Sequence, residues 1–484
     1  MVNARNTIRL LSMPMLWMGV VQLTFGCLSL FLFRDNNAAA FFEPGITLLS
    51  LSLIIILAMK QTDLSKISNR DALLFATLTW LLCGILGALP IEIVTDVSYI
   101  DAVFESISAL TTTGATILTG LDDMPRSFLM YRQFLQWMGG LGIVIFVVAV
   151  LPMLNVGGMR LIKAETPGPV KDDKLSPRIA STAHYFWMVY LIITTLCAFS
   201  YWMAGMSAYD AIGHSFTTVS TGGFSTHDAS LGYFDSHVIF AISNIFMLLG
   251  AISFGLHFRV LNSARPKLYW QDEETRIFLL LVTLMALMLG VYLFSNNSYQ
   301  SFGECLSYAF FYVISFITST GFGGDDIGQW PEATAMFLVF AGYLGGCAGS
   351  TAGGNKIIRD IVTFKVIRRE IWQLLHPHSE LVLRYQKRPV NRDTRNAVMA
   401  FMSFAAGSSM LITLLLTMTG MDFWSAFTAV AACVNVLGPG FGEVASNFQS
   451  VSDFGTLLLS AAMILGRLEY FTVLALFFPA FWRY

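Results

Sequence analysis

Charged residues are scarce in this chain. Of its 484 residues only 12 % are charged, whereas 55 % are hydrophobic, and a typical soluble domain carries about 25 % charged residues. A chain this long with so little charge cannot cover its surface in water, and several of its apolar runs approach the length of a membrane span. These features exclude a soluble enzyme, a nucleic-acid-binding protein and a secreted disulfide scaffold. We therefore predict a polytopic integral membrane protein.

Cysteine is also sparse, and its spacing carries no metal or redox signal. The six cysteines lie in or beside apolar stretches and form no Cys-x-x-Cys pair, so we interpret them as small buried residues. The net charge of −2 gives no global field that would favour nucleic acid. The first apolar run, residues 10–33, is too long for a signal peptide and lacks a small-residue cleavage site. We expect it to be a retained transmembrane helix.

The basic residues are confined to a few segments. Of the 29 Lys and Arg, 25 fall in six regions: the N-terminal tail, 60–70, 160–178, 259–276, 356–395 and Arg483. Cytoplasmic loops collect Lys and Arg, so we predict that these regions and both termini are cytoplasmic. Region 356–395, with ten basic residues, is typical of a solvated segment near anionic membrane lipid.

Acidic residues fill the loops on the other side, among them Asp122, Asp228 and Asp325. A vestibule lined by such residues would raise the local cation concentration. The alternative is that outer loops are simply polar.

Between the basic regions the chain repeats one order of segments four times: a long apolar run, a shorter one, a Ser/Thr/Gly-rich knot, an acidic loop and a second long run. The first glycines of the knots, Gly114, Gly222, Gly321 and Gly438, are 108, 99 and 117 residues apart. Repetition on this scale indicates duplication of a structural unit. We expect an N-terminal helix pair over 1–68 and four pore repeats over 69–160, 161–265, 266–385 and 386–484.

The short run before each knot gives only about three helical turns, too few to cross a membrane. A re-entrant helix followed by irregular backbone is tolerated at membrane depth only where it is buried or lines water. Four such units therefore predict packing around a shared axis. Helix C-termini would point partial negative charge to the centre, and loop carbonyls can replace the hydration shell of a cation.

The predicted fold class is thus an all-α polytopic membrane protein with ten crossings. Four pseudo-symmetric repeats, each with a first crossing (M1), a pore helix and a second crossing (M2), surround one pore and follow an extra transmembrane helix pair. The knots Leu-Thr-Thr-Thr-Gly, Val-Ser-Thr-Gly-Gly-Phe and Ser-Thr-Gly-Phe-Gly resemble the single-glycine filter segments of the Trk/Ktr/HKT superfamily of potassium transport proteins. The likeness covers nearly the whole chain. Its extra helix pair is similar to the bacterial TrkH/TrkG branch rather than to the shorter KtrB branch.

This resemblance implies a gated, potassium-selective uptake pore in the bacterial inner membrane. It implies a homodimer with one pore per protomer and a cytoplasmic, TrkA-like regulatory subunit that binds nucleotides and docks on the basic region 356–395. Potassium is then the permeant ion, and no organic cofactor is expected. The implied potassium ligands are backbone carbonyls at Thr112, Thr113, Gly114, Ser220, Thr221, Gly222, Ser319, Thr320, Gly321, Val436, Leu437 and Gly438. The fourth segment has Val436 and Leu437 where the others have Thr or Ser, which would interrupt a layer of side-chain hydroxyls.

A run of glycines interrupts the M2 segment of the third repeat. Five of them, Gly345, Gly346, Gly349, Gly353 and Gly354, fall within ten residues, and each costs a helix interior about 1 kcal/mol relative to alanine. Close helix packing through small residues is the alternative. Because the run is continuous, we favour an intramembrane loop under the filter, which the resemblance identifies as the gate.

Arg467 is the one basic residue deep in an apolar helix, where a central arginine costs about 2.5–3.5 kcal/mol on insertion scales. Its charge needs water or a partner, which leaves a pore-facing residue or a structural ion pair, for example with Glu469. The resemblance favours a pore-facing Arg467 that touches the glycine run and acts as an electrostatic barrier.

Two other functions fit parts of the pattern. A secondary transporter coupled to protons or sodium would use discontinuous helices at the midplane, although two inverted halves would indicate it better than four like units. A non-transporting scaffold or receptor would have no use for four re-entrant segments. The sequence contains no nucleophile–base pair, Walker loop or metal-ligand spacing, so we do not expect an enzyme.

Overall fold

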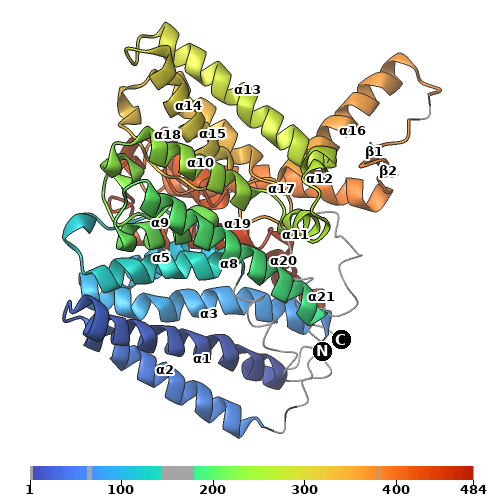
Figure 1. Cartoon of the computed structure of the whole chain (residues 1–484). Helices are drawn as coiled ribbons and strands as arrows, with labels where there is room; N and C mark the ends of the chain where they lie inside the picture. The colour runs from blue at the N-terminus through green and yellow to red at the C-terminus, as the bar shows by residue number, and fades with distance from the viewer. Residues whose placement is uncertain (1–3, 61, 63–67, 143–178, 380, 483–484) are drawn as a thin grey trace.

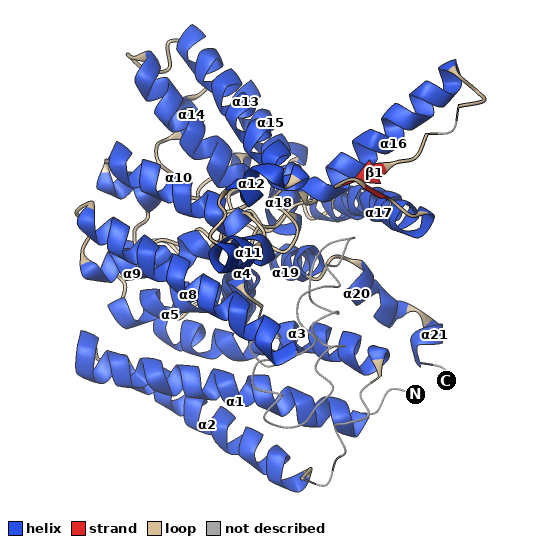
Figure 2. Cartoon of the chain, turned by 45° about the vertical axis from the view of Figure 1, so that its right-hand side comes forward, coloured by secondary structure: helices blue, strands red, loops and turns tan. Residues whose placement is uncertain are grey.

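The computed structural model describes residues 4–60, 62, 68–142, 179–379 and 381–482, in which nearly all of the regular secondary structure is helical (Figure 1 and Figure 2). The predicted boundary between the first two repeats, at 160/161, lies outside the described residues. So do the basic region 160–178 and most of the region 60–70.

Three kinds of helix recur four times in chain order. The M1 helices are α3 (Asn69–Thr95), α8 (Ile179–Met203), α13 (Glu273–Ser295) and α17 (Arg392–Thr417). The pore helices are α4 (Tyr99–Thr111), α9 (Ala208–Val219), α14 (Phe302–Ile317) and α18 (Phe423–Val434). The M2 helices are α5 (Arg126–Gly140), α10 (His237–Ala251), α15 (Ala333–Leu344) and α19 (Asp453–Arg467).

Each pore helix begins at a side chain that caps its first free N–H groups. Ser98, Ser207 and Ser301 each accept a hydrogen bond at 3.1 Å from the backbone N–H three residues on, and Asp422 caps α18 in the same manner. The third residue is acidic in the first three repeats, which places negative charge at the positive end of the helix. A short local pattern therefore starts each re-entrant helix at the same point of its repeat.

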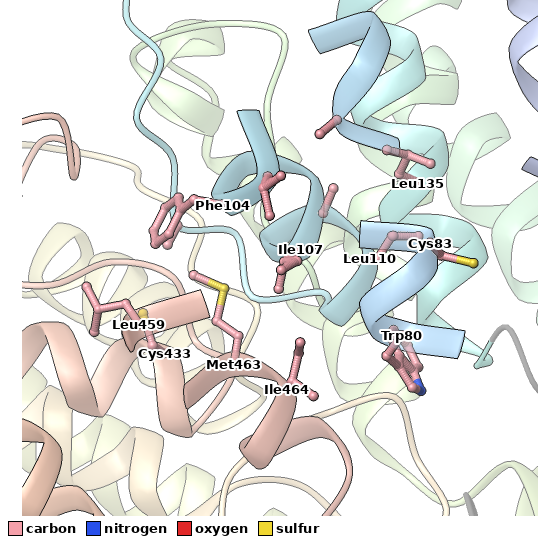
Figure 3. Close-up of a cluster of buried hydrophobic side chains, with 14 of the residues drawn as sticks. Trp80, Cys83, Phe104, Ile107, Leu110, Leu135, Cys433, Leu459, Met463 and Ile464 are labelled. Atoms are coloured by element: carbon pink, nitrogen blue, oxygen red, sulfur yellow. The ribbon is translucent and has the colours of Figure 1, made fainter. Parts of the chain in front are cut away.

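The repeats close into a circle. The M2 helix of each repeat packs against the pore helix of the next, α5 on α9, α10 on α14 and α15 on α18, and α19 of the fourth repeat packs on α4 of the first. Figure 3 shows this last contact, where Leu459 and Met463 of α19 approach Phe104 and Ile107 of α4 in one buried cluster. The circular order confirms the predicted all-α fold with four repeats around one axis.

The extra helix pair lies on the outside of the first repeat (Figure 1). It consists of α1 (Ala4–Leu28), continued by the π-helical turn η1 (Ser29–Phe33), and α2 (Ala38–Ala58). Both helices contact α3. Asp35, between them, accepts a hydrogen bond at 2.8 Å from the backbone N–H of Ser127 in α5.

Short elements occupy the connections. A 3-10 turn lies in the outer loop of each repeat: η3 (Leu121–Asp123), η5 (Ser230–Phe234), η6 (Ile327–Gln329) and η7 (Gly442–Val444). At the opposite ends lie α11 (Phe254–Ser263), α12 (Lys267–Gln271), α20 (Phe471–Leu474), η8 (Ala475–Phe477) and α21 (Pro479–Trp482). The helix α16 (Ile357–Leu375) and a hairpin of β1 (Arg384–Tyr385) and β2 (Arg388–Pro389) project from the bundle (Figure 1).

Among the described residues six helices are long and apolar enough to cross a membrane, or eight if two bent pairs each count as one span. The bent pairs are α10 with α11, at 97°, and α19 with the segment Phe471–Phe477, at 108°. The M2 helices of the first and third repeats have only 15 and 12 residues. Ten crossings, which stay a prediction, require that these two M2 segments also be counted as broken spans.

Candidate ion pathway

All four pore helices end in the same backbone motif. A residue just past the helix has positive φ in each repeat: Thr112, Thr221, Ser319 and Val436, at 62°, 55°, 54° and 57°. It directly follows α4 and comes two residues after the end of the other three pore helices. The N–H of the following residue then bonds to the carbonyl five positions back, at 2.8 to 2.9 Å. This is the Schellman arrangement, in which glycine is the usual residue at the left-handed position. Any residue other than glycine there costs about 1–3 kcal/mol, so the surrounding structure must hold the backbone in place.

Four glycines join these motifs into a closed ring of backbone. A Cβ atom built on the ring glycine of each repeat would meet a carbonyl oxygen of the next repeat. The pairs are Gly114 with Gly222 at 2.2 Å, Gly223 with Thr320 at 1.9 Å, Gly321 with Leu437 at 2.2 Å, and Gly438 with Thr113 at 2.6 Å. All four glycines also have positive φ, between 77° and 98°. Both the close approach and the left-handed backbone require glycine.

In the second repeat the ring glycine is one residue later than the sequence predicts. Aligning the first glycines of the four segments pairs Gly222 with Gly114. The residue equivalent to Gly114 is Gly223, because Gly222 supplies the carbonyl that corresponds to that of Thr113. Ser220 is therefore one position before the motif, at the end of α9. The other predicted ligand positions fall in matching places around the ring. They are buried except for Gly114 and Gly321, which are partly exposed. Because Gly222 and Gly223 are adjacent, the spacing of the repeats could not show which of them has the left-handed backbone.

Behind the ring, each pore helix uses a different polar side chain to hold the segment that leaves the ring. Glu105 accepts hydrogen bonds from the Thr116 hydroxyl at 3.0 Å and the Ile117 N–H at 3.1 Å. The His214 ring lies 2.9 Å from the Ser225 hydroxyl. In the third repeat the Tyr312 hydroxyl bonds the backbone of Gly324 and Asp325, and in the fourth the Thr428 hydroxyl bonds that of Phe441.

Two side chains of α5 complete this support, and sequence reasoning missed both. Arg132 donates to Glu105 at 2.9 Å through Nε, and both side chains are fully buried. Gln136 donates to the carbonyl of Gly222 at 2.7 Å and accepts the N–H of Phe224 at 3.0 Å. For Arg132 the sequence did offer a signal, because Glu105 and Arg132 are opposite charges in two consecutive helices of one repeat.

The four ring glycines line an outer vestibule of about 1050 Å³. Asp228, Asp325 and Asp326, all in predicted acidic outer loops, also line it. The pore helices end at its floor, and their C-terminal ends add partial negative charge there. The vestibule is therefore suited to attract cations to the ring.

On the other side of the ring the third M2 segment breaks. The helix α15 ends at Leu344 and α16 begins at Ile357, so the predicted interruption is confirmed, and we refer to residues 345–356 as the glycine loop. Gly345, Gly349 and Gly354 have positive φ. The Gly353 N–H donates to the Ser319 hydroxyl at 2.5 Å, so the loop touches the filter segment directly.

Arg467 lies beside this loop, as expected. Its guanidinium donates to the Thr351 carbonyl at 3.0 Å and to the carbonyls of Gly139 and Gly140 at 2.6 and 2.9 Å. It also reaches the Thr112 hydroxyl at 3.3 Å. Together with the glycine loop it lines a small cavity of about 80 Å³ under the ring.

Glu469, the ion-pair partner considered for Arg467, pairs with Arg359 of α16 at 2.6 Å. The other M2 helices also stop at this level, at Gly140, Ala251 and Arg467. Sequence reasoning found the break in the third repeat because five glycines mark it, and missed the others because their apolar runs continue past the break.

The chain has close relatives among known proteins. The family model described as TrkH, cation transport protein, matches residues 39–484. The Trk system potassium uptake protein TrkH of Salmonella typhimurium is 43 % identical over 454 residues, 93 % of this chain and 94 % of that protein. The TrkH protein of Vibrio parahaemolyticus is 42 % identical over 99 % of both chains, and TrkG of Escherichia coli is 38 % identical over 86 % of both. The crystal structure of the potassium transporter TrkH from Vibrio parahaemolyticus matches over all of both chains, with a TM-score of 0.89 and 39 % identity.

Proposed function

The chain belongs to the TrkH family of cation transport proteins and is a transport protein rather than an enzyme; from this membership and the backbone ring we propose that it takes up potassium through a gated, selective pore. The curated relatives are named as potassium uptake proteins. The observation that carries the proposal is the closed ring formed by four glycines and four carbonyls of neighbouring repeats. Rings of backbone carbonyls can replace the hydration shell of a monovalent cation.

In this proposal the predicted positions other than Ser220, with Gly223 added, form the potassium site. The carbonyls of Thr113, Gly222, Thr320 and Leu437 make one layer, and those of the preceding residues, Thr112, Thr221, Ser319 and Val436, make the next. Because backbone supplies the ligands, the fourth repeat can contribute Val436 and Leu437 without loss of a ring member. The hydroxyl layer, by contrast, stays incomplete there.

The glycine loop and Arg467 are the proposed gate. The loop lies directly under the ring, and Arg467 places a positive charge among its hydrogen-bond acceptors. An ion that leaves the ring must pass both. Movement of the loop would open the path, whereas the arginine would raise the barrier for a cation until the loop moves.

The membrane location, regulation and oligomeric state that we propose are based on the family resemblance. We propose a bacterial inner-membrane protein with cytoplasmic termini, regulated by a nucleotide-binding subunit and paired as a homodimer. Large apolar side chains on the projecting helix α16, Phe364, Ile371 and Leu374, are 68 %, 55 % and 81 % exposed. A second protomer would cover them. Efficient disulfide cross-linking of a Phe364→Cys protein to itself in membranes would support this pairing.

The test of transport is rubidium uptake into liposomes that contain only the purified chain, driven by a potassium gradient. We expect uptake that persists with a proton ionophore and is blocked by potassium but not by sodium. Uptake that collapses with the proton gradient would instead support a coupled secondary transporter. If the chain alone is silent, the nucleotide-binding subunit is added, and continued absence of selective uptake would refute the proposal.

A further inference from the structure

One buried carboxylate outside the glycine loop binds two parts of it. Glu274, in the first turn of α13, is only 6 % exposed. Its Oε1 atom accepts the backbone N–H of Ala348 at 2.8 Å and that of Ile358 at 3.1 Å. Ala348 lies within the glycine loop and Ile358 in the first turn of α16. A single oxygen of the M1 helix thus ties the loop to the helix that follows it.

The acidic residues at the start of α13, Asp272, Glu273 and Glu274, also bind the β1–β2 hairpin. The second oxygen of Glu274 accepts the Tyr385 hydroxyl at 3.4 Å. Glu273 accepts the backbone N–H of Gln386 at 2.9 Å, and Asp272 accepts its side-chain amide at 2.7 Å. The hairpin and the glycine loop are therefore held by adjacent residues of one helix end.

The energetic reason for this contact lies in the loop itself. Its glycines have no side chains to pack, so backbone hydrogen bonds must hold its conformation. A buried N–H that loses its hydrogen-bond acceptor is destabilised. The carboxylate in turn is tolerated in a buried position because it accepts several hydrogen bonds.

We propose that Glu274 is a positioning residue that holds the glycine loop across the pathway, and that the β1–β2 hairpin controls this contact from the side opposite the vestibule. The inference rests on the proposed function, in which the loop is the gate. In this inference, a regulatory subunit that moves the hairpin would act on the glycine loop through the contact between Tyr385 and Glu274.

Cys347, next to Ala348 in the loop, offers a readout that does not depend on transport. It is 1 % exposed, so its reaction with a water-soluble thiol reagent reports opening of the loop. We expect Glu274→Leu to speed this labelling about tenfold, because two buried N–H groups lose their shared acceptor. Glu274→Gln retains an acceptor oxygen, so its labelling should stay within about threefold of wild type. Peptide mass spectrometry on the full-length protein in liposomes would measure the rates.

Matched controls separate a local effect from general loosening. Glu370→Gln makes the same chemical change as Glu274→Gln at an exposed position of α16 and should leave labelling unchanged. The fully buried Cys83 and Cys433 should stay unreactive in every variant. Faster labelling of all three cysteines, or unchanged labelling of Cys347 in a folded Glu274→Leu protein, would overturn the proposal.

The role of the hairpin has its own test. Tyr385→Ala should speed Cys347 labelling about threefold alone and add nothing in the Glu274→Leu protein, because both act through one contact. Additive effects would overturn the hairpin route. Rubidium uptake by the same preparations distinguishes failure of the proposed function from failure of the proposed role of Glu274. If no potassium-selective uptake is seen, with or without the regulatory subunit, the proposed function is refuted whatever the labelling rates of Cys347 show. Selective uptake that rises with Cys347 labelling supports both.

Discussion

Alanine at each of the four ring glycines should weaken potassium selectivity in an order set by the packing of the ring. The contact distances of the built Cβ atoms are 1.9 Å at Gly223, 2.2 Å at Gly114 and Gly321, and 2.6 Å at Gly438. Real Cβ atoms essentially never come closer than 3.0 Å to another heavy atom. The carbonyl in contact must therefore move by at least 1.1 Å in the first case, 0.8 Å in the next two and 0.4 Å in the last.

These displacements bracket the tolerance of a binding site, which is about 0.5 Å. We expect Gly223→Ala to lose nearly all discrimination between potassium and sodium, and Gly438→Ala to retain part of it. Each alanine also needs a left-handed backbone, which costs about 1–2 kcal/mol. This second term is common to the four positions, so it lowers stability throughout without changing the order.

The assay is the ratio of rubidium to sodium uptake by purified variants in liposomes, with thermal stability as a check on folding. Gly222→Ala is the matched comparison, because a Cβ there meets the end of the Gln136 side chain, at 2.5 Å, rather than a ring carbonyl. It should reduce selectivity less than Gly223→Ala. A larger loss at Gly222 than at Gly223, or the reverse order among the ring positions, would refute the register and the packing argument.

Three further changes test the surroundings of the ring. Arg467→Ala should raise rubidium uptake without changing selectivity, since it removes the charge under the ring, and unchanged uptake by a folded variant would contradict the barrier role. Ser319→Ala removes the acceptor of the Gly353 N–H, a net loss of about 0.5–1.5 kcal/mol, and should raise uptake severalfold with selectivity kept. Burial alone would lower the pKa of His227, but the neighbouring carboxylates of Asp210 and Asp122 raise it above its usual value. Its contribution to stability is therefore full below about pH 6.5 and lost as pH rises through the raised pKa, so the difference in melting temperature between wild type and His227→Gln should shrink at alkaline pH.

Much of the architecture could be predicted because local sequence patterns that recur in each repeat determine it. Apolar length and the positions of Lys and Arg marked the M1 helices, and the cap residues at Ser98, Ser207 and Ser301 mark the start of the pore helices. Five clustered glycines marked the break after Leu344. Each of these signals acts within a few residues of its effect, so the sequence alone displays it.

The parts that could not be predicted depend on contacts between distant residues. The position of Gly223 in the ring is decided by the carbonyl of Thr320 in the next repeat, which no spacing reveals. The support of Gly222 by Gln136 likewise joins residues of two repeats. Between α10 and α11 the chain turns by 97° without a cluster of glycines, so composition gave no warning of that break.

These inter-repeat contacts explain how four unequal sequences can build one ring. Each ring carbonyl lies against the glycine of the preceding repeat, and each M2 helix packs on the pore helix of the following one. Only the glycine and the left-handed residue before the carbonyl are constrained by this geometry, so the side chains behind the ring are free to differ. Glu105, His214 and Tyr312 occupy equivalent positions of their pore helices and hold the segment that leaves the ring by different chemistry. A substitution behind one repeat should therefore alter that quarter of the ring alone, whereas a ring glycine acts on two repeats at once.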